Sequence, residues 1–370
     1  MSLVYNQAQK DLAHTVKRFV AERTPMAKVR AVIDSDATYC VETWRQIAQQ
    51  LGLAALSVPA EYEGVGASQS DIAAALRELG AGLVPSPLLG SAVLATGALV
   101  ALDDEAAKNE LLPRLAGGQI VATLAVSERE SRSWVPGKPA TLATYRGDAV
   151  RLSGTKTAVL NGVDADILLV AATGADGLGI YLVRNGAPGV TAQAANSADP
   201  TTAAATVVFE NTPANRLAGD AANALDKVCD QANVAIAALQ SGAISACLTM
   251  QTEYAKIRYS FGQPIGAYQG VKHKIADIYT AHALADAQLR VATDAADHGA
   301  AHASVAITAA RVLLNDLYFR AAMQNQLFHG GIGHTWEHDS HWYTKNALVL
   351  AQLAGNQDYQ RDRLADKLGL

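Results

Sequence analysis

Arg258-Tyr259-Ser260-Phe261-Gly262-Gln263-Pro264-Ile265, followed by Gln269-Gly270-Val271-Lys272-His273, is the most specific pattern in the chain. Arg258 offers a planar fork of N–H donors that suits a pyrophosphate, and Phe261 offers a ring face for stacking on adenine. Taken alone, a surface arginine and a core phenylalanine explain these two residues more simply. The pattern therefore needs support from the rest of the sequence.

Long Ala- and Leu-rich segments lie on both sides of this pattern. Apolar residues recur at helical spacing from Val234 to Tyr259, from Ile275 to Asp297 and from Ser304 to Gln326. Segments of this length are typical of a helical bundle, which we expect over residues 216–370.

The pattern changes in the middle of the chain. Short β-prone runs, separated by Gly, Asp, Asn and Pro, predict a small antiparallel β domain over residues 118–215. These runs are Ala149–Leu152, Ile167–Val170, Ile180–Val183 and Thr206–Phe209. Residues 1–117 return to helical spacing, as in Trp44, Ile47 and Leu51 before Gly52. The sequence thus predicts a mainly α fold with a central β domain.

Composition excludes several classes of protein. Half of the 370 residues are hydrophobic, so the chain can bury a large core. The net charge of −5, with mixed signs throughout, offers no basic face for a nucleic-acid backbone. No signal peptide is expected, and Leu83–Leu102, broken by Pro85 and Pro87, is expected to be a buried helix, so no membrane partner is predicted. Three separated cysteines favour free thiols in a reducing cytoplasm.

Two further segments resemble one known family together with the first pattern. They are Ser57-Val58-Pro59-Ala60-Glu61-Tyr62-Glu63-Gly64-Val65-Gly66 and His329-Gly330-Gly331-Ile332-Gly333-His334-Thr335-Trp336-Glu337-His338. All three segments resemble motifs of the acyl-CoA dehydrogenases, in family order and across the whole chain. The resemblance implies an FAD enzyme that introduces an α,β double bond into an acyl-CoA thioester and passes electrons to an acceptor protein.

The resemblance also implies which residues touch the cofactor. In the family, the matching positions hold the AMP half of FAD across a dimer interface, for a flavin that works in the neighbouring subunit. Here these positions are Arg258, Ser260, Phe261, Gln269, Gly330 and Gly331. The Gly pair would let backbone approach a cofactor closely, although it could equally form an ordinary turn. The family's Gln before the Gly pair is replaced by Leu327, with Gln326 displaced by one position.

The catalytic carboxylate of the family is missing at both of its known locations. The segment Ala354-Gly355-Asn356-Gln357 places Ala354 where most members carry the Glu that removes the α-proton. A minority of members carry it on the preceding long helix, where this chain has Ala232. Asn233 stands where the family often has a substrate-binding Arg, whereas Asp230 is retained. No catalytic residue is therefore predicted.

Residues that the family places beside the flavin ring are also missing. Where members commonly read Trp-x-Thr/Ser-Asn-Gly, this chain reads Ala158-Val159-Leu160-Asn161-Gly162, and in the loop Ser127–Arg132 only Ser127 could donate to a flavin. We therefore expect an α2β2 assembly with a homologous, catalytically complete partner. Paired subunits of this kind occur among actinobacterial dehydrogenases that act on CoA thioesters of steroid side chains, and Thr335–Asp339 resembles that branch.

Three alternatives stay open at this point. A self-sufficient dehydrogenase could use Glu337, Asp230 or Asp358 as its base. A zinc peptidase could use His334-Thr335-Trp336-Glu337-His338, with two histidines on one helix face and His341 as a third ligand. A structural paralogue would bind no flavin even in a complex.

Overall fold

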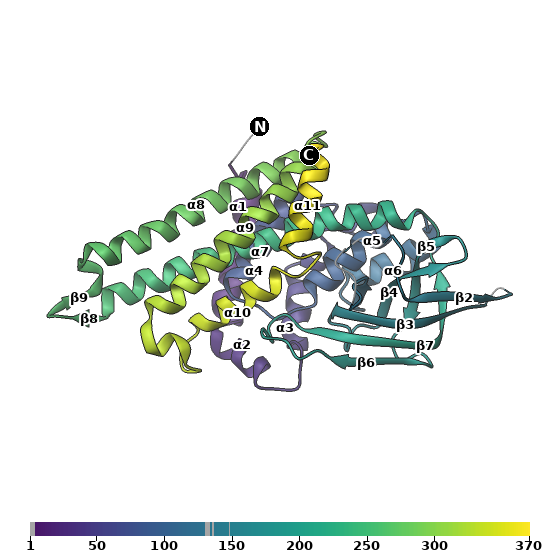
Figure 1. Cartoon of the computed structure of the whole chain (residues 1–370), viewed down its shortest axis with the longest axis horizontal. Helices are drawn as coiled ribbons and strands as arrows, with labels where there is room; N and C mark the ends of the chain where they lie inside the picture. The colour runs from purple at the N-terminus through teal and green to yellow at the C-terminus, as the bar shows by residue number, and fades with distance from the viewer. Residues whose placement is uncertain (1–3, 130–133, 135–136, 148) are drawn as a thin grey trace.

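The computed structural model describes residues 4–129, 134, 137–147 and 149–370. Helices form the first part of the chain, strands the middle and helices the last part, which confirms the predicted fold class (Figure 1). The N-terminal helices are α1 Gln7–Arg23, α2 Met26–Ile33, α3 Val41–Arg45, η1 Gln46–Gln50, η2 Leu53–Ala55, η3 Ala60–Tyr62, α4 Gln69–Ala81, η4 Leu88–Ala95, α5 Thr96–Ala101 and α6 Glu105–Ala116.

The middle of the chain forms one sheet. Its strands are β1 Ala122–Ala125, β2 Leu142–Arg146, β3 Ala149–Leu160, β4 Ile167–Gly174, β5 Gly177–Arg184, β6 Val190–Ala194 and β7 Ala204–Arg216. Strand β5 pairs with both β4 and β7, so the path β4-β2-β3-β7-β5 closes on itself. Most strand pairs are antiparallel, as expected, but β4 pairs in parallel with β1 and with β2. Its register with β1 is set by long-range packing, which local sequence does not encode.

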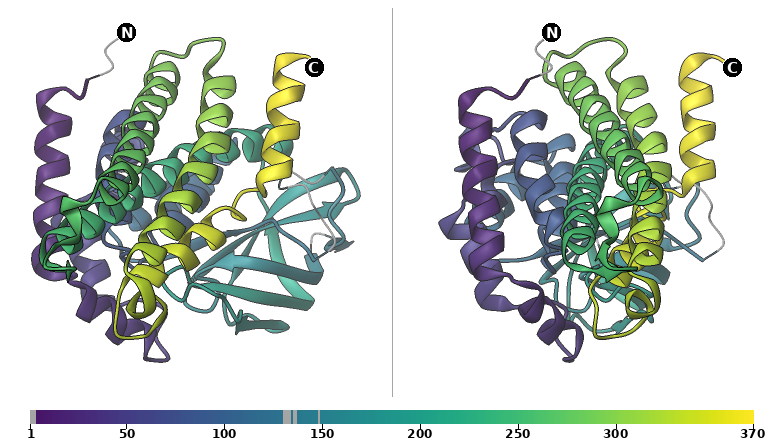
Figure 2. Two further views of the ribbon diagram at one scale, coloured as in Figure 1. Left: turned by 60° about the vertical axis from the view of Figure 1, so that its left-hand side comes forward. Right: turned by 90° about the vertical axis from the view of Figure 1, so that its left-hand side faces the viewer.

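The last part of the chain contains three long helices and several short elements. These are α7 Ala221–Ile257, β8 Tyr259–Ser260, β9 Gln263–Pro264, η5 Ile265–Ala267, α8 Gln269–Asp297, α9 Ala303–Phe328, η6 Gly330–His334, α10 Ser340–Leu350 and α11 Gln357–Leu368. Helix α7 begins where the carboxylate of Asp220 accepts hydrogen bonds from the N–H groups of Ala222 and Asn223. Figure 2 shows helices from both ends of the chain packed together, with the sheet to one side.

Helices α4 and α7 cross closely because glycine stands at the crossing point. A Cβ on Gly80 would lie 2.2 Å from the carbonyl oxygen of Leu239, and one on Gly242 would lie 1.7 Å from that of Arg77. No larger residue fits without moving a backbone. This contact joins the N-terminal helices to the C-terminal ones in one core.

The apolar stretch at 83–102 is buried, as expected, with η4 and α5 inside the core. Within the described residues, α7 is the one helix long and apolar enough to cross a membrane, and 67% of its apolar window is buried in the fold. The core helix of a soluble protein can have the same length and apolar composition, so α7 is weak evidence for a membrane-spanning helix. The three cysteines are free, with Cys229 and Cys247 buried and Cys40 exposed.

Candidate cofactor and substrate site

Three segments that are distant in sequence meet at one small cavity. Ser127, just after β1, Ala158 of β3 and Ala354, just after α10, all line it. Ala158 and Ala354 are two of the places where the sequence departs from the family's flavin and substrate positions, and Ser127 is the one residue of its loop expected to donate to a flavin. The fold thus brings two expected losses and one retained donor together at one point.

The cavity has a volume of about 30 Å³, which is room for about one water molecule. Ligand pockets are typically about 300–1,000 Å³. Leu89, Leu94, Ile236 and the buried Trp134 occupy the surrounding space. The residues present therefore do not fit a flavin ring at this position. Trp134 was not predictable from the sequence, because the Ser- and Arg-containing stretch around it has no periodic pattern.

A buried ion pair fixes the segment next to Ser127. Lys156 Nζ donates to Glu128 Oε1 at 2.7 Å, and Glu128 also accepts from the N–H groups of Ala140 and Thr141 and from the Thr141 hydroxyl. Burial alone would raise the pKa of Glu128, but these donors lower it to about 2. Burial lowers the pKa of Lys156, and Glu128 offsets part of that shift. The four donors to Glu128 keep the pair ionised.

None of the described residues that line the cavity is an Asp or a Glu. Ala354 lies at φ +53°, and its carbonyl oxygen accepts from Gln360 Nε2 at 2.6 Å. Ala232, the second family location, is fully buried in α7, and Asn233 Nδ2 donates to Gln360 Oε1 at 3.0 Å. Among the residues that the structure describes, the lining of the cavity thus holds no carboxylate that could accept an α-proton.

The three candidate bases of a self-sufficient enzyme lie elsewhere. Asp230 accepts from Arg363 at 2.7 Å, in an ion pair that Asp226 shares. Asp358 and Glu337 are exposed, and none of the three lines the cavity with Ala354. The geometry assigns no described carboxylate to the proton-transfer position.

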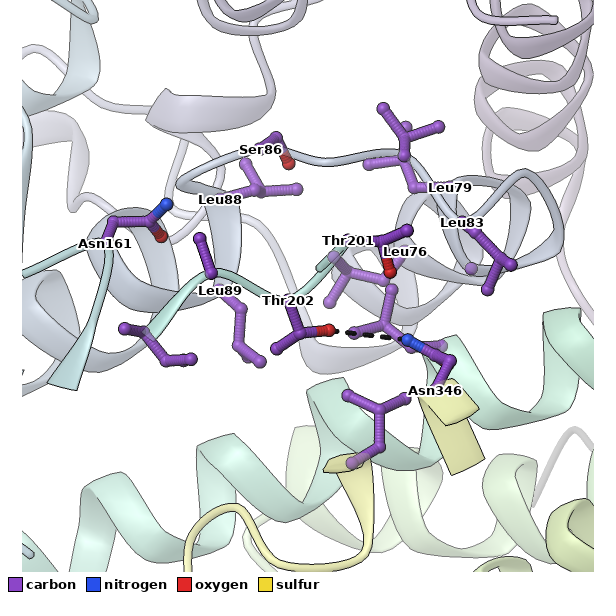
Figure 3. A pocket seen from close by; sticks show the side chains of 16 residues that line it. Leu76, Leu79, Leu83, Ser86, Leu88, Leu89, Asn161, Thr201, Thr202 and Asn346 are labelled. Atoms are coloured by element: carbon purple, nitrogen blue, oxygen red, sulfur yellow. Dashed lines mark hydrogen bonds between the residues drawn. The ribbon is translucent and has the colours of Figure 1, made fainter. Parts of the chain in front are cut away.

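A second cavity, of about 70 Å³, lies beyond Leu89 and Leu160, which line both cavities. Leucines of α4 and η4 form much of its wall, and Thr202 and Asn346 meet at one side (Figure 3). Asn346 Nδ2 donates to the Thr202 hydroxyl at 3.4 Å and to the buried Asp199 at 2.8 Å. This volume is also too small for an acyl chain with a ring system.

The expected AMP-binding residues lie at the far end of the molecule from the sheet. Arg258 ends α7, and the β8–β9 hairpin projects beyond it (Figure 1). Phe261 is at the hairpin tip, 95% exposed and at φ +50°. Ser260 holds the hairpin through its carbonyl oxygen, which accepts from the Tyr268 hydroxyl at 3.0 Å, and Gln269 begins α8 with an exposed side chain.

The Gly pair is near the same end. Tyr254, one turn before Arg258, contacts the His329 ring at 4.4 Å between centroids, and Gly330 and Gly331 follow His329. Both glycines are exposed, and a Cβ on either would meet no atom within 4 Å. Packing within this chain does not require Gly331 to be glycine. The space above the pair is open to a ligand or to another subunit.

The expected zinc helix is not present. Element η6 ends at His334, and Thr335 is extended, so His334 and His338 do not share a helix face. Instead His334 Nδ1 lies 3.0 Å from Gln326 Nε2, and His338 Nδ1 lies 3.0 Å from the Ser340 hydroxyl. Among residues 4–129, 134, 137–147 and 149–370, no three His, Cys, Asp or Glu side chains are grouped to hold a metal. The helix that a zinc peptidase would need at His334 and His338 is therefore absent from the described residues.

Comparison with known proteins identifies the family. Models of the N-terminal and C-terminal domains of acyl-CoA dehydrogenases match residues 6–119 and 222–369. Acyl-CoA dehydrogenase IpdE2 of Mycobacterium tuberculosis is 35% identical over 344 residues, which are 92% of this chain and 91% of the relative. The chain belongs to the acyl-CoA dehydrogenase family. Members of this family are FAD-dependent oxidoreductases that act on CH–CH groups.

Solved acyl-CoA dehydrogenases share the whole fold. A variant of the Tcur3481–Tcur3483 steroid acyl-CoA dehydrogenase superposes with a TM-score of 0.88 at 29% identity, covering 98% of each chain. The ChsE4–ChsE5 complex of Mycobacterium tuberculosis gives a TM-score of 0.90 at 25% identity, covering 100% of this chain and 99% of the other. Both relatives are pairs of different subunits by name.

Proposed function

We propose that this acyl-CoA dehydrogenase chain is the non-catalytic subunit of a heteromeric enzyme. It would lend residues for the AMP half of FAD to a homologous partner that introduces an α,β double bond into an acyl-CoA. One observation carries the proposal: Ser127, Ala158 and Ala354 line a cavity of about 30 Å³, and none of the described residues in its lining is acidic. On this proposal the chain supplies neither the space nor the base for the reaction.

The exposed end of the molecule supports the lending role. Arg258 has no ion-pair partner among the described residues, and Phe261 is exposed although it is a large apolar residue. Beside them, α8 and α9 form a groove of about 520 Å³, with Phe319, Met323 and Leu327 among its lining. An exposed apolar groove next to unpaired donors is suited to an interface between subunits.

The chemistry divides between the two chains. When bound, FAD would accept the hydride from the β-carbon, and the partner's carboxylate would take the α-proton. In this chain, Arg258 would donate to the pyrophosphate, Phe261 would stack on the adenine, and Gly330 and Gly331 would let the backbone approach the cofactor. Ser260 and Gln269 would complete this half-site, and Ser127 would stay without a flavin contact.

The pairing in the two solved relatives supports a homologous partner, which we place in an α2β2 assembly. One relative is a steroid acyl-CoA dehydrogenase, which supports a CoA thioester of a steroid side chain as substrate. We further place the enzyme in a reducing cytoplasm, because its three cysteines are free. An electron-transfer protein would reoxidise the flavin.

Flavin content tests the proposal directly. The chain purified alone should bind almost no FAD and should oxidise no acyl-CoA, whereas the complex with its partner should hold one FAD per pair of subunits. Native mass spectrometry and flavin absorbance measure both quantities. A yellow, active single chain would contradict the half-site and would favour the self-sufficient enzyme.

A matched pair of variants tests the lent residues. Arg258→Ala in the co-expressed complex should lower FAD occupancy severalfold, because the pyrophosphate loses a charge-assisted contact. Lys256→Ala is the control, since Lys256 lies two residues away and pairs only with Glu253 on the surface. Unchanged FAD occupancy in Arg258→Ala would support the alternative of a structural paralogue.

A further inference from the structure

An apolar hollow among the N-terminal helices lies away from the residues described above. It has a volume of about 490 Å³ and is formed by the end of α1, by α2, by the segment 35–40 and by α3. Its apolar lining includes Val29, Val32, Val41 and Val84. This volume falls within the usual range for small-molecule sites, unlike the cavities of about 30 and 70 Å³.

The rim of this hollow is cationic. Arg23 and Lys28 both line it, both are exposed, and neither forms an ion pair with any described residue. The one acidic residue in the lining, Glu42, is already paired with Arg45 and accepts from Gln46 Nε2 at 3.0 Å. An apolar interior with two free cations at its edge is complementary to an anionic head on an apolar body.

We propose that the hollow bordered by Arg23, Lys28, Val29 and Val32 is a binding site for an aliphatic monocarboxylate. The hydrocarbon chain would lie against the valines, and the carboxylate would lie between the two cations. The site would be separate from the cavity at Ala354, and the inference does not depend on the proposed half-site role.

Chemical labelling of Cys40 can report whether the site is occupied. It lines the same hollow and is exposed, whereas Cys229 and Cys247 are buried. The side chain and the backbone N–H of Thr43 lower the pKa of the Cys40 thiol, which increases its reactivity near neutral pH. A thiol reagent should therefore label one cysteine per native chain, and a bound ligand should shield it.

The experiment follows the labelling rate of the full-length chain with a disulfide reagent. Dodecanoate below its micellar concentration should slow labelling at least fivefold at saturation and should raise the melting temperature. Arg23→Gln and Lys28→Gln should each raise the half-protecting concentration by up to about fivefold. Arg18→Gln, a cation of α1 that does not line the hollow, should leave it unchanged.

Three outcomes would overturn the inference. Dodecanol could protect as well as dodecanoate, which would show that the cations do not recognise the head group. Labelling could be unaffected by dodecanoate up to its micellar limit, with wild-type melting behaviour. Finally, Cys40 could already be shielded in the co-purified complex without ligand, which would assign the hollow to the partner subunit.

Discussion

Ala354 combines two properties that bear on its role. Its backbone lies in the left-handed region at φ +53°, which costs an alanine about 1 kcal/mol, and its side chain lines a cavity of about 30 Å³. A missing base could be restored by one substitution if the pocket were intact. Here Leu89, Leu94 and Trp134 line the cavity around Ala354, and on the proposed role the chain lacks the pocket as well as the base.

Ala354→Glu should therefore produce no dehydrogenase activity in this chain. The longer side chain would overfill the cavity and bury a carboxylate, so we expect the free energy of unfolding to fall by about 1–3 kcal/mol. Urea denaturation measures this change. Ala354→Gly is the control, and it should stay within about 0.5 kcal/mol of the wild type, since relief at positive φ offsets the added backbone freedom. Activity in Ala354→Glu would show that the pocket opens.

Glu128 and Lys156 predict a particular dependence of stability on pH. Because the folded pKa of Glu128 is lowered to about 2, its contribution is complete above its unfolded value of 4.5 and is lost as pH falls toward 2. Glu128→Gln should remove this acid-side loss. At pH 7 it should also cost about 3–5 kcal/mol, because Lys156 would stay buried without its partner. Denaturation curves at pH 7 and pH 3 would reveal both effects.

At the scale of elements, the backbone conformation at the tip of the β8–β9 hairpin does not suit the residues found there. Its two turn residues, Phe261 and Gly262, both have positive φ, at +50° and +82°. Such two-residue turns prefer Asn-Gly, because asparagine tolerates this backbone better than a bulky aromatic residue. A fully exposed phenylalanine at this position buries nothing within the chain. A contact outside the chain, as in the half-site proposal, would give this side chain a role.

Phe261→Asn should therefore have opposite effects on the free chain and on the complex. In the free chain the turn becomes favourable, and we expect the free energy of unfolding to rise by about 1 kcal/mol. In the complex the adenine loses its stacking face, so FAD occupancy should fall. Thermal denaturation and flavin absorbance measure the two effects separately. A variant that stabilises the chain and keeps full FAD occupancy would contradict the stacking role.

Much of the fold was predictable, because local periodicity sets its elements. The runs at 149–152 and 167–170 became β3 and β4, and Gly52 ends the helical segment before it with φ +67°. The parallel register of β1 with β4 was not predictable, since it joins residues 45 positions apart. The filling of the cavity by Trp134 was not predictable either, because no local pattern shows where a loop side chain packs.

At the scale of the whole molecule, the C-terminal helices expose apolar side chains that no other described part of this chain covers. Exposed apolar side chains occur on α8, α9 and the elements next to them, and Leu327, which is 62% exposed, lines the groove with Phe319 and Met323. From the sequence alone, Leu327 is only the residue that replaces the family's glutamine. In the structure Leu327 enlarges an apolar surface, which suits contact with a partner.

Leu327→Asp should weaken assembly with the catalytic partner without unfolding the chain. Burying an unpaired carboxylate at the interface is costly, so we expect the dissociation constant of the complex to rise at least tenfold. Leu368→Asp is the matched control, because Leu368 is similarly exposed but lies at the end of α11. Light scattering of the co-expressed pairs would show the difference. Equal assembly by both variants would place the interface elsewhere.

The meeting of Ser127, Ala158 and Ala354 at one filled cavity also limits how this chain can change. Ala158 and Ala354 belong to different segments, so on the proposed role reverting either of them alone would restore no turnover and would give selection nothing to act on. Independent activity would need both reversions at once, together with a smaller residue at Trp134. On this proposal, dependence on a second gene product is hard to reverse, and both genes would have to be inherited together.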